Sequence, residues 1–198
     1  MAENDKEKDI INIVIHGRGG QGVVTASEII AEAAFLSGNF VDVHAYPSFG
    51  AERRGAPVQA YAKLSRKEKI WDRAQIENPN ILIILDETIL NQNIVSSLKD
   101  NGIFIINSAK EPKYFADKFT LSNIKIIVAD INKLALEKGL TIDGAPIINT
   151  PILGLLSKSL TDLSLDNLNK VVQKRMSKEL GKFNIELIEE GYKLAKIL

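Results

Sequence analysis

Four closely spaced glycines near the start of the chain lie between an apolar run and a helix-forming segment. They are Gly17, Gly19, Gly20 and Gly22, and three of them match the pattern G-x-G-x-x-G. Residues 10–16 are expected to form a strand, and residues 23–37, rich in Ala, Ile and Glu, a helix. A helix that begins at such a loop directs unpaired backbone N–H groups and the positive end of its dipole toward the loop. The spacing therefore favours binding of an anion, such as a phosphate, a carboxylate or an acidic side chain of a partner.

Side chains within this loop are candidates for the same role. Arg18 and Gln21 offer hydrogen-bond donors, and Thr25 lies in the first turn of the expected helix. Two other interpretations fit the same residues: a turn that only lets the helix pack closely on its strand, and a dinucleotide site. A dinucleotide site calls for an acidic residue at the end of the second strand. Asp42 is 20 residues past Gly22 but lies near the start of that strand, which argues against free NAD binding.

A second loop, residues 47–57 (PSFGAERRGAP), contains two prolines and two glycines, which give it a defined shape. Its centre carries the densest charged cluster of the chain: Glu52, Arg53 and Arg54. A pair of arginines is suited to a phosphate or to the carboxylates of a partner protein. A solvated turn is the alternative interpretation of this loop.

Composition excludes several classes of function. The chain has 198 residues, of which 45% are hydrophobic, and 25 basic residues balance 25 acidic ones, which disfavours binding to duplex nucleic acid. The absence of cysteine excludes disulfides, thiolate-held zinc or iron–sulfur clusters and a cysteine nucleophile in this chain, and two histidines cannot build a histidine-rich metal site. The charged start is not a signal peptide, and no apolar run is long enough to span a membrane, so we expect a cytoplasmic protein with no membrane partner.

Apolar strands alternate with helical segments along the rest of the chain, which predicts an α/β fold with a mainly parallel, Rossmann-like sheet and flanking helices. Residues 1–9 are expected to be a flexible tail, and residues 10–198 a single domain with a helical C-terminal extension over 178–197. The strand over 58–64 is predicted to be antiparallel, because no helix separates it from the strand before it. No element is predicted for residues 109–122. Further strands are predicted over 40–46, 81–85, 103–107 and 124–129, and helices over 132–138 and 151–160. Ser164 is expected to cap a further helix that begins after it.

Polar residues follow several of these strands and are expected to meet at the carboxyl edge of the sheet, where α/β proteins bind ligands. They are His16, Asp86, Glu87, Asn107, Ser108, Asp130, Asn149 and Thr150. His16 could donate a hydrogen bond to a bound anion or simply end its strand. Trp71, the only tryptophan, is expected to pack in the core or at an interface rather than to stack on a ligand.

Two motifs at a characteristic separation resemble a known family. HGRGGQGVVTASEIIAEAA followed by YPSFGAERRGAPVQAY resembles the gamma subunit of 2-oxoacid:ferredoxin oxidoreductases. The form FGAERRGAP is most similar to the pyruvate (pyruvate synthase) and branched-chain branches, and ENPNILIILDETIL and GAPIINTPILGLLSK are also similar to that subunit. The resemblance covers residues 10–196.

This resemblance implies an enzyme complex that oxidatively decarboxylates a 2-oxoacid, transfers the acyl group to coenzyme A and passes electrons to ferredoxin. It implies alpha, beta and delta subunits as partners, with thiamine diphosphate held by alpha and beta and [4Fe-4S] clusters by beta and delta. The gamma subunit is then a non-catalytic, structural part, and it either helps to bind coenzyme A or serves only as a scaffold whose glycine loop is buried against another subunit. The residues proposed to contact coenzyme A or a partner subunit are Gly17, Arg18, Gly19, Gly20, Gln21, Gly22, Thr25, Arg53 and Arg54. A stand-alone nucleotide-binding protein that uses the glycine loop is the alternative.

Overall fold

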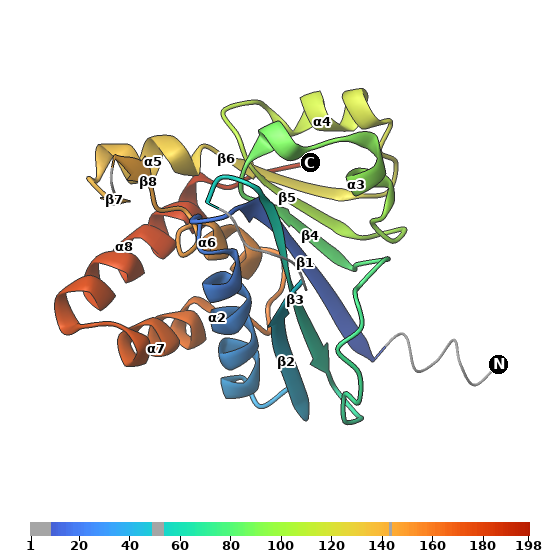
Figure 1. Cartoon of the computed structure of the whole chain (residues 1–198), viewed down its shortest axis with the longest axis horizontal. Helices are drawn as coiled ribbons and strands as arrows, with labels where there is room; N and C mark the ends of the chain where they lie inside the picture. Colours follow the sequence, from blue (N-terminus) through green and yellow to red (C-terminus); the bar gives the residue numbers. More distant parts are fainter. Residues whose placement is uncertain (1–8, 49–53, 143) are drawn as a thin grey trace.

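A seven-stranded sheet runs through the centre of the molecule, with helices on both of its faces (Figure 1). The structure is a computed structural model that describes residues 9–48, 54–142 and 144–198. The strands follow the order β2-β3-β1-β4-β5-β6-β9 across the sheet. Their bounds are β1 Ile10–Arg18, β2 Asp42–Pro47, β3 Pro57–Ser65, β4 Ile81–Ile84, β5 Ile103–Asn107, β6 Lys125–Ala129 and β9 Lys196–Ile197.

The four central strands β1, β4, β5 and β6 are parallel to one another. β3 is antiparallel to both β1 and β2, so β2 runs in the same direction as the central strands. β9 closes the other edge of the sheet and pairs antiparallel with β6. Because parallel strands connected by helices have both faces covered, their sequences are continuous apolar runs such as ILII in β4.

Successive residues of each strand point to opposite faces and build two hydrophobic clusters. Ile13 and Ile15 of β1 belong to one cluster, which includes buried apolar residues from α2, α5, α6, α7 and α8. Val14, between them, belongs to the other cluster, under α3 and α4. The helices and the remaining short elements are α2 Val23–Leu36, η1 Glu87–Ile89, α3 Gln92–Ser96, α4 Pro112–Phe119, α5 Ile131–Glu137, β7 Thr141–Ile142, β8 Ala145–Pro146, α6 Ile152–Ser157, α7 Leu165–Arg175 and α8 Lys178–Leu194.

The structure confirms the predicted α/β class, the mainly parallel sheet and the antiparallel third strand. Ser164 caps α7 as expected, since its hydroxyl accepts a hydrogen bond from the N–H of Asn167. Two predictions of local structure are wrong. Residues 109–122, for which no element was predicted, contain α4, and the final helix ends at Leu194 instead of continuing to residue 197.

Both errors have a physical reason. α4 is short and polar overall, and it is stabilised by burial of Phe115 and Phe119, which lie one helical turn apart. Lys196 and Ile197 leave the helix because the edge of β6 offers backbone partners: Leu198 and Ile126 exchange two backbone hydrogen bonds of 2.9 Å. Within the described residues, no helix is long and apolar enough to cross a membrane. Residues 1–8 of the expected tail lie outside the described part of the chain.

Candidate functional site: the glycine loop and the neighbouring crevice

The glycine loop connects the last residues of β1 to the first turn of α2, as predicted. Gly20 and Gly22 have φ angles of +97° and +74°, in the region that only glycine adopts without strain. A Cβ atom at Gly17 would lie 2.6 Å from Cγ2 of Val23, so this glycine lets the helix approach its strand. A Cβ at Gly22 would lie 2.5 Å from Nδ2 of Asn149. The loop therefore packs closely against two neighbours, α2 and Asn149.

The N-terminus of α2 is open toward this loop. Gly22 is its N-cap residue, no side chain of the described residues caps it, and its first turn contains no acidic residue. Thr25 lies half-buried in that turn. The first backbone N–H groups of the helix and the positive end of its dipole thus face the loop, and the first turn has no acidic side chain to neutralise them. This arrangement suits an anion.

The guanidinium group of Arg18 makes three hydrogen bonds within the chain. Its Nε donates to Oδ2 of Asp86 at 2.9 Å, Nη1 to the carbonyl of Gly55 at 2.9 Å and Nη2 to Oγ1 of Thr88 at 2.7 Å. The guanidinium group thus holds the glycine loop, residue 55 and the end of β4 together. Gln21 tightens the same loop, because its Oε1 accepts a 2.7 Å hydrogen bond from the N–H of Arg18.

The two sequence motifs lie side by side. The N–H of Gly19 donates to the carbonyl of Ala56, and the N–H of Gly55 donates to the carbonyl of Gly19. Gly19 also forms a parallel bridge with Arg54, an exposed residue whose Cγ would lie 3.8 Å from a Cβ at Gly20. Arg53 and Glu52 fall outside the described residues. No sequence pattern predicts this pairing, because it depends on β3 running antiparallel beside β1.

A crevice of about 380 Å³ opens next to the loop, at the carboxyl ends of the parallel strands. The prediction that polar residues after the strands meet at one edge is confirmed here for most of them. The lining includes Gln21, Asp86, Glu87, Asn107, Ser108, Lys110 and Asp130. Three of these side chains are carboxylates and one is a lysine, so the crevice has an excess of negative charge.

The charges of the crevice are mostly matched within the chain. Burial raises the pKa of Glu87, but hydrogen bonds from Lys110 and Ser108 outweigh burial, so the net pKa lies below its usual range. Lys110 donates to Glu87 at 2.6 Å. Asn107 is structural: its amide donates to the carbonyl of Leu85, and its oxygen accepts from the N–H of Ile131. These contacts leave little capacity for a further anion inside the crevice.

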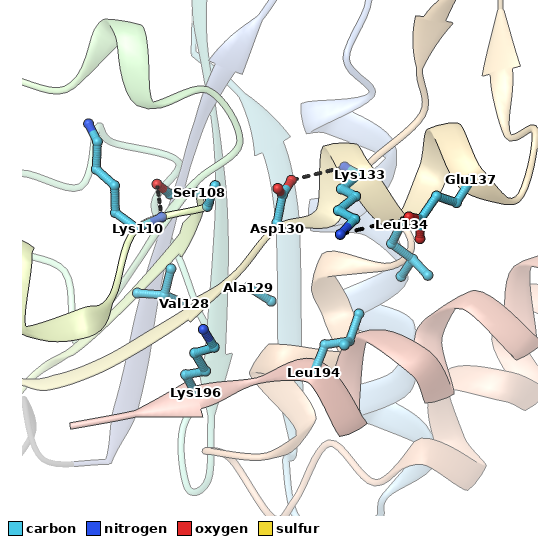
Figure 2. Close-up of a pocket in the computed structure, with 11 residues that line it drawn as sticks. Ser108, Lys110, Val128, Ala129, Asp130, Lys133, Leu134, Glu137, Leu194 and Lys196 are labelled. Carbon is cyan, nitrogen blue, oxygen red and sulfur yellow. Dashed lines mark hydrogen bonds and ion pairs between the residues drawn. The ribbon is translucent and has the colours of Figure 1, made fainter.

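A second pocket of about 240 Å³ lies on the other side of residues 108–110, between β6, α5 and the end of α8 (Figure 2). In Figure 2 the side chain of Lys110 points away from Asp130, whose carboxylate accepts from the N–H of Lys133. Lys196, at the lower rim, forms an ion pair with Glu111. These charged groups are paired with neighbours and do not converge on a common point.

His16 and Asp42 are the other two candidates near the loop. Burial lowers the pKa of His16 to about 4, so the imidazole is neutral at pH 7 and contributes no positive charge to the loop. Asp42 lies at the amino end of β2, where its carboxylate accepts from the N–H of Ile70 at 2.7 Å. It is therefore far along the strand from the position at which a ribose-binding acid is needed. Among the described residues, no group of three or more His, Cys, Asp or Glu side chains could hold a metal ion.

Asn149 is the neighbour of the loop whose position sequence reasoning did not resolve. It is buried, and its Oδ1 has no hydrogen-bond partner among the described residues. The contact between Gly22 and Asn149 joins residues far apart in sequence, so no local pattern could have revealed it. The adjacent Thr150 donates to Oδ1 of Asn184 in α8 at 2.5 Å, which fixes this segment below the loop.

Comparison with known proteins agrees with the two motifs. The pyruvate ferredoxin/flavodoxin oxidoreductase family matches residues 12–194. The chain is 38% identical to the pyruvate/ketoisovalerate oxidoreductases common subunit gamma of Pyrococcus furiosus, over 95% of this chain and 98% of the relative. It is also 38% identical to pyruvate synthase subunit PorC of Methanothermobacter marburgensis, over 94% of this chain and 98% of the relative.

A solved structure supports the same relationship. The chain superposes on pyruvate oxidoreductase subunit PORC of Thermotoga maritima with a TM-score of 0.79 and 33% identity, covering 96% of this chain and 98% of that one. A 2-oxoglutarate:ferredoxin oxidoreductase from Magnetococcus marinus shares the fold, with a TM-score of 0.73 and 21% identity over 31% of its chain. The chain therefore belongs to the pyruvate ferredoxin/flavodoxin oxidoreductase family, in its gamma-subunit branch.

Proposed function

We propose that this chain is a non-catalytic gamma subunit in the cytoplasm, within a complex that oxidises a 2-oxoacid, with pyruvate as the first candidate, to an acyl-coenzyme A and reduces ferredoxin. The observation that carries this proposal is the similarity to gamma and PorC subunits over nearly the full length of both chains. The alpha, beta and delta subunits are the proposed partners. They would hold thiamine diphosphate and the [4Fe-4S] clusters, since this chain has no cysteine to supply thiolates.

We further propose that this chain contacts a phosphate of coenzyme A at the glycine loop. Coenzyme A supplies the thiol that accepts the acyl group. The open N-terminus of α2, the positive-φ glycines Gly20 and Gly22, and the half-buried Thr25 support an anion on the α2 side of the loop. The carboxylates of the crevice disfavour a phosphate on the opposite side.

The other residues of the loop have supporting roles in this proposal. Gly17 and Gly19 set the course of the backbone, Gln21 and Arg18 hold its shape, and Arg53 and Arg54 contact the phosphate or a neighbouring subunit. Arg18 acts chiefly as a clamp, because three of its N–H groups donate within the chain.

Anaerobic purification of the chain from its native source tests the proposed function. We expect it to co-purify with a thiamine-dependent enzyme and an iron–sulfur protein, and the fraction to reduce a low-potential dye only when a 2-oxoacid and coenzyme A are both present. A panel of 2-oxoacids then identifies the substrate. Isolation of the chain alone and inactive, together with tight nucleotide binding in calorimetry, would favour a stand-alone nucleotide-binding protein.

The double substitution Arg53→Ala and Arg54→Ala tests the coenzyme A contact in the assembled complex. We expect a higher apparent KM for coenzyme A if the arginines contact its phosphates, and loss of a subunit if they contact a partner. Lys178→Ala with Lys182→Ala is the matched control, since it removes two exposed positive charges from α8. Normal assembly with an unchanged KM in the arginine variant would exclude both roles.

A further inference from the structure

Trp71, the only tryptophan of the chain, is 87% exposed. It lies on residues 66–80, which connect β3 to β4 and contain no helix or strand; we call this segment the strap. A tryptophan has a large apolar surface, and exposing nearly all of it to water is unfavourable. The sequence predicted Trp71 to lie either in the core or at an interface. Its exposure excludes the core and leaves the interface.

The backbone on both sides of Trp71 is held to the sheet. On one side, Ile70 is buried and its N–H donates to Asp42 at 2.7 Å. On the other side, Asp72 pairs with Lys63 of β3, and the carbonyl of Ala74 accepts a 2.8 Å hydrogen bond from the hydroxyl of Tyr46. The indole is thus carried on a fixed backbone, which lowers the conformational entropy that docking would cost.

Positive charge flanks the indole. Lys69 and Arg73 are both exposed, and neither forms a hydrogen bond or ion pair with another described residue. Asp72, the acidic residue between Trp71 and Arg73, is already engaged by Lys63 at 2.5 Å. Within the described part of the chain, the surface around Trp71 therefore presents an aromatic anchor and two exposed cations that have no ion-pair partner there.

The strap lies at the opposite end of the sheet from the glycine loop. β3 ends at Ser65, which pairs with Ile10 at the start of β1, whereas the glycine loop follows the last residue of β1, Arg18. In Figure 1 the connection from β3 to β4 lies near the entry of the chain into β1, away from the start of α2. A partner bound to the strap therefore leaves the glycine loop accessible.

We propose that the strap is a docking surface for another subunit of the complex, one that offers an apolar pocket for Trp71 and a rim of carboxylates for Lys69 and Arg73. Buried tryptophans and arginines are the residues that contribute most to protein interfaces, and flanking charges increase the association rate. The identity of the partner as a subunit rests on the proposed function, whereas the anchor and its charges are properties of this chain.

Subunit dissociation measured on the full complex tests the proposal. Trp71→Ser is expected to weaken retention of one partner subunit about 30-fold or more, as for a central interface residue. Lys69→Glu with Arg73→Glu is expected to slow association about 10-fold at low salt, with the difference shrinking as salt rises. Trp71→Phe should retain part of the affinity, and Leu136→Ser, which alters an exposed apolar residue on α5, should leave it unchanged.

A direct readout comes from fluorine NMR of the chain labelled with 5-fluorotryptophan, which gives a single resonance because there is one tryptophan. We expect this resonance to be exposed to solvent in the isolated chain and shielded from it in the complex. The docking proposal is wrong, while the proposed function stands, if Trp71→Ser assembles as well as the wild type and the tryptophan resonance of the wild-type chain stays exposed in the complex. If the isolated chain dimerises through Trp71, the occupant is a second copy and the proposal is overturned. If the wild-type chain binds no subunit, the proposed function itself fails.

Discussion

Replacement of Gly22 by alanine should destabilise the protein more than replacement of Gly38, which has the same backbone conformation but no close neighbour. Gly22 and Gly38 both have a φ angle of +74°. A Cβ at Gly38 would have no atom within 4 Å, whereas a Cβ at Gly22 would lie 2.5, 2.7 and 3.0 Å from Nδ2, Cγ and Cβ of Asn149. Gly38→Ala therefore measures the strain of the left-handed backbone alone, and Gly22→Ala measures the strain plus the steric contact.

The magnitudes follow from these two contributions. A left-handed backbone costs a non-glycine residue about 1–2 kcal/mol, which is the expected effect of Gly38→Ala. Forcing an extra methyl group into a packed environment adds about 1–3 kcal/mol. Asn149 cannot avoid this contact by a change of rotamer, because its own Cβ is among the close atoms and the residue is buried. We therefore expect Gly22→Ala to lower the free energy of unfolding by about 2–5 kcal/mol.

Urea denaturation followed by circular dichroism gives both free energies, provided that each transition is two-state. The variant Asn149→Ala completes a double-mutant cycle, since it removes Cγ and Nδ2 from the contact. If the contact is responsible, Gly22→Ala should cost at least about 1 kcal/mol less in the Asn149→Ala background than in the wild type. Equal destabilisation by Gly22→Ala and Gly38→Ala, or an additive cycle, would refute the idea that Asn149 constrains the glycine loop.

Three other perturbations follow from described contacts. Burial lowers the pKa of His16 to about 4 in the folded protein, against about 6.5 in the unfolded chain. The free energy of unfolding should therefore contain about 3 kcal/mol above pH 6.5 that is lost as the pH falls toward 4. In His16→Asn, the free energy of unfolding measured with urea should change less between these two pH values. A Cβ at Gly154 would lie 2.1 Å from a backbone carbonyl of α8, so Gly154→Ala should lower the free energy of unfolding by about 3 kcal/mol or more. Gly181→Ala is the control, since no neighbour lies closer than 3.5 Å, and it should be neutral or stabilising; an equal loss of stability in both variants would argue against the contact. Burial raises the pKa of Asp86, but hydrogen bonds from Thr88 and Arg18 outweigh burial, so the net pKa lies below its usual range. Asp86→Asn should therefore cost about 1 kcal/mol at pH 7, because it weakens these hydrogen bonds, and the difference from wild type should shrink as the pH falls below the usual carboxyl range. A difference that does not depend on pH would contradict this origin.

Local patterns were sufficient to predict most of the fold. Continuous apolar runs such as ILIIL identified the buried parallel strands, and the absence of a helix between β2 and β3 predicted their antiparallel pairing. Ser164 was recognised as a cap because N-capping depends on one residue and its next three neighbours. These features are determined by interactions between residues that are close in sequence.

Long-range contacts explain what could not be predicted. The hydrogen bond between Arg18 and Asp86 joins residues 68 positions apart, and only the sheet order brings the two together. The same is true of Asn149 below Gly22. The position of Trp71 outside the core also required the structure, since the strap has no regular secondary structure that would specify its inward face.

β9 has a consequence for how the protein is handled in solution. Its two residues cover the outer edge of β6, and the exchange of hydrogen bonds between Leu198 and Ile126 satisfies backbone groups that would otherwise be open to another chain. An uncovered, apolar edge strand is a template for intermolecular pairing. Truncation at Leu194, or a rigid fusion that pulls residues 196–198 away, is thus a route to concentration-dependent aggregation, while a tag on a long polar linker after Leu198 leaves this protection in place.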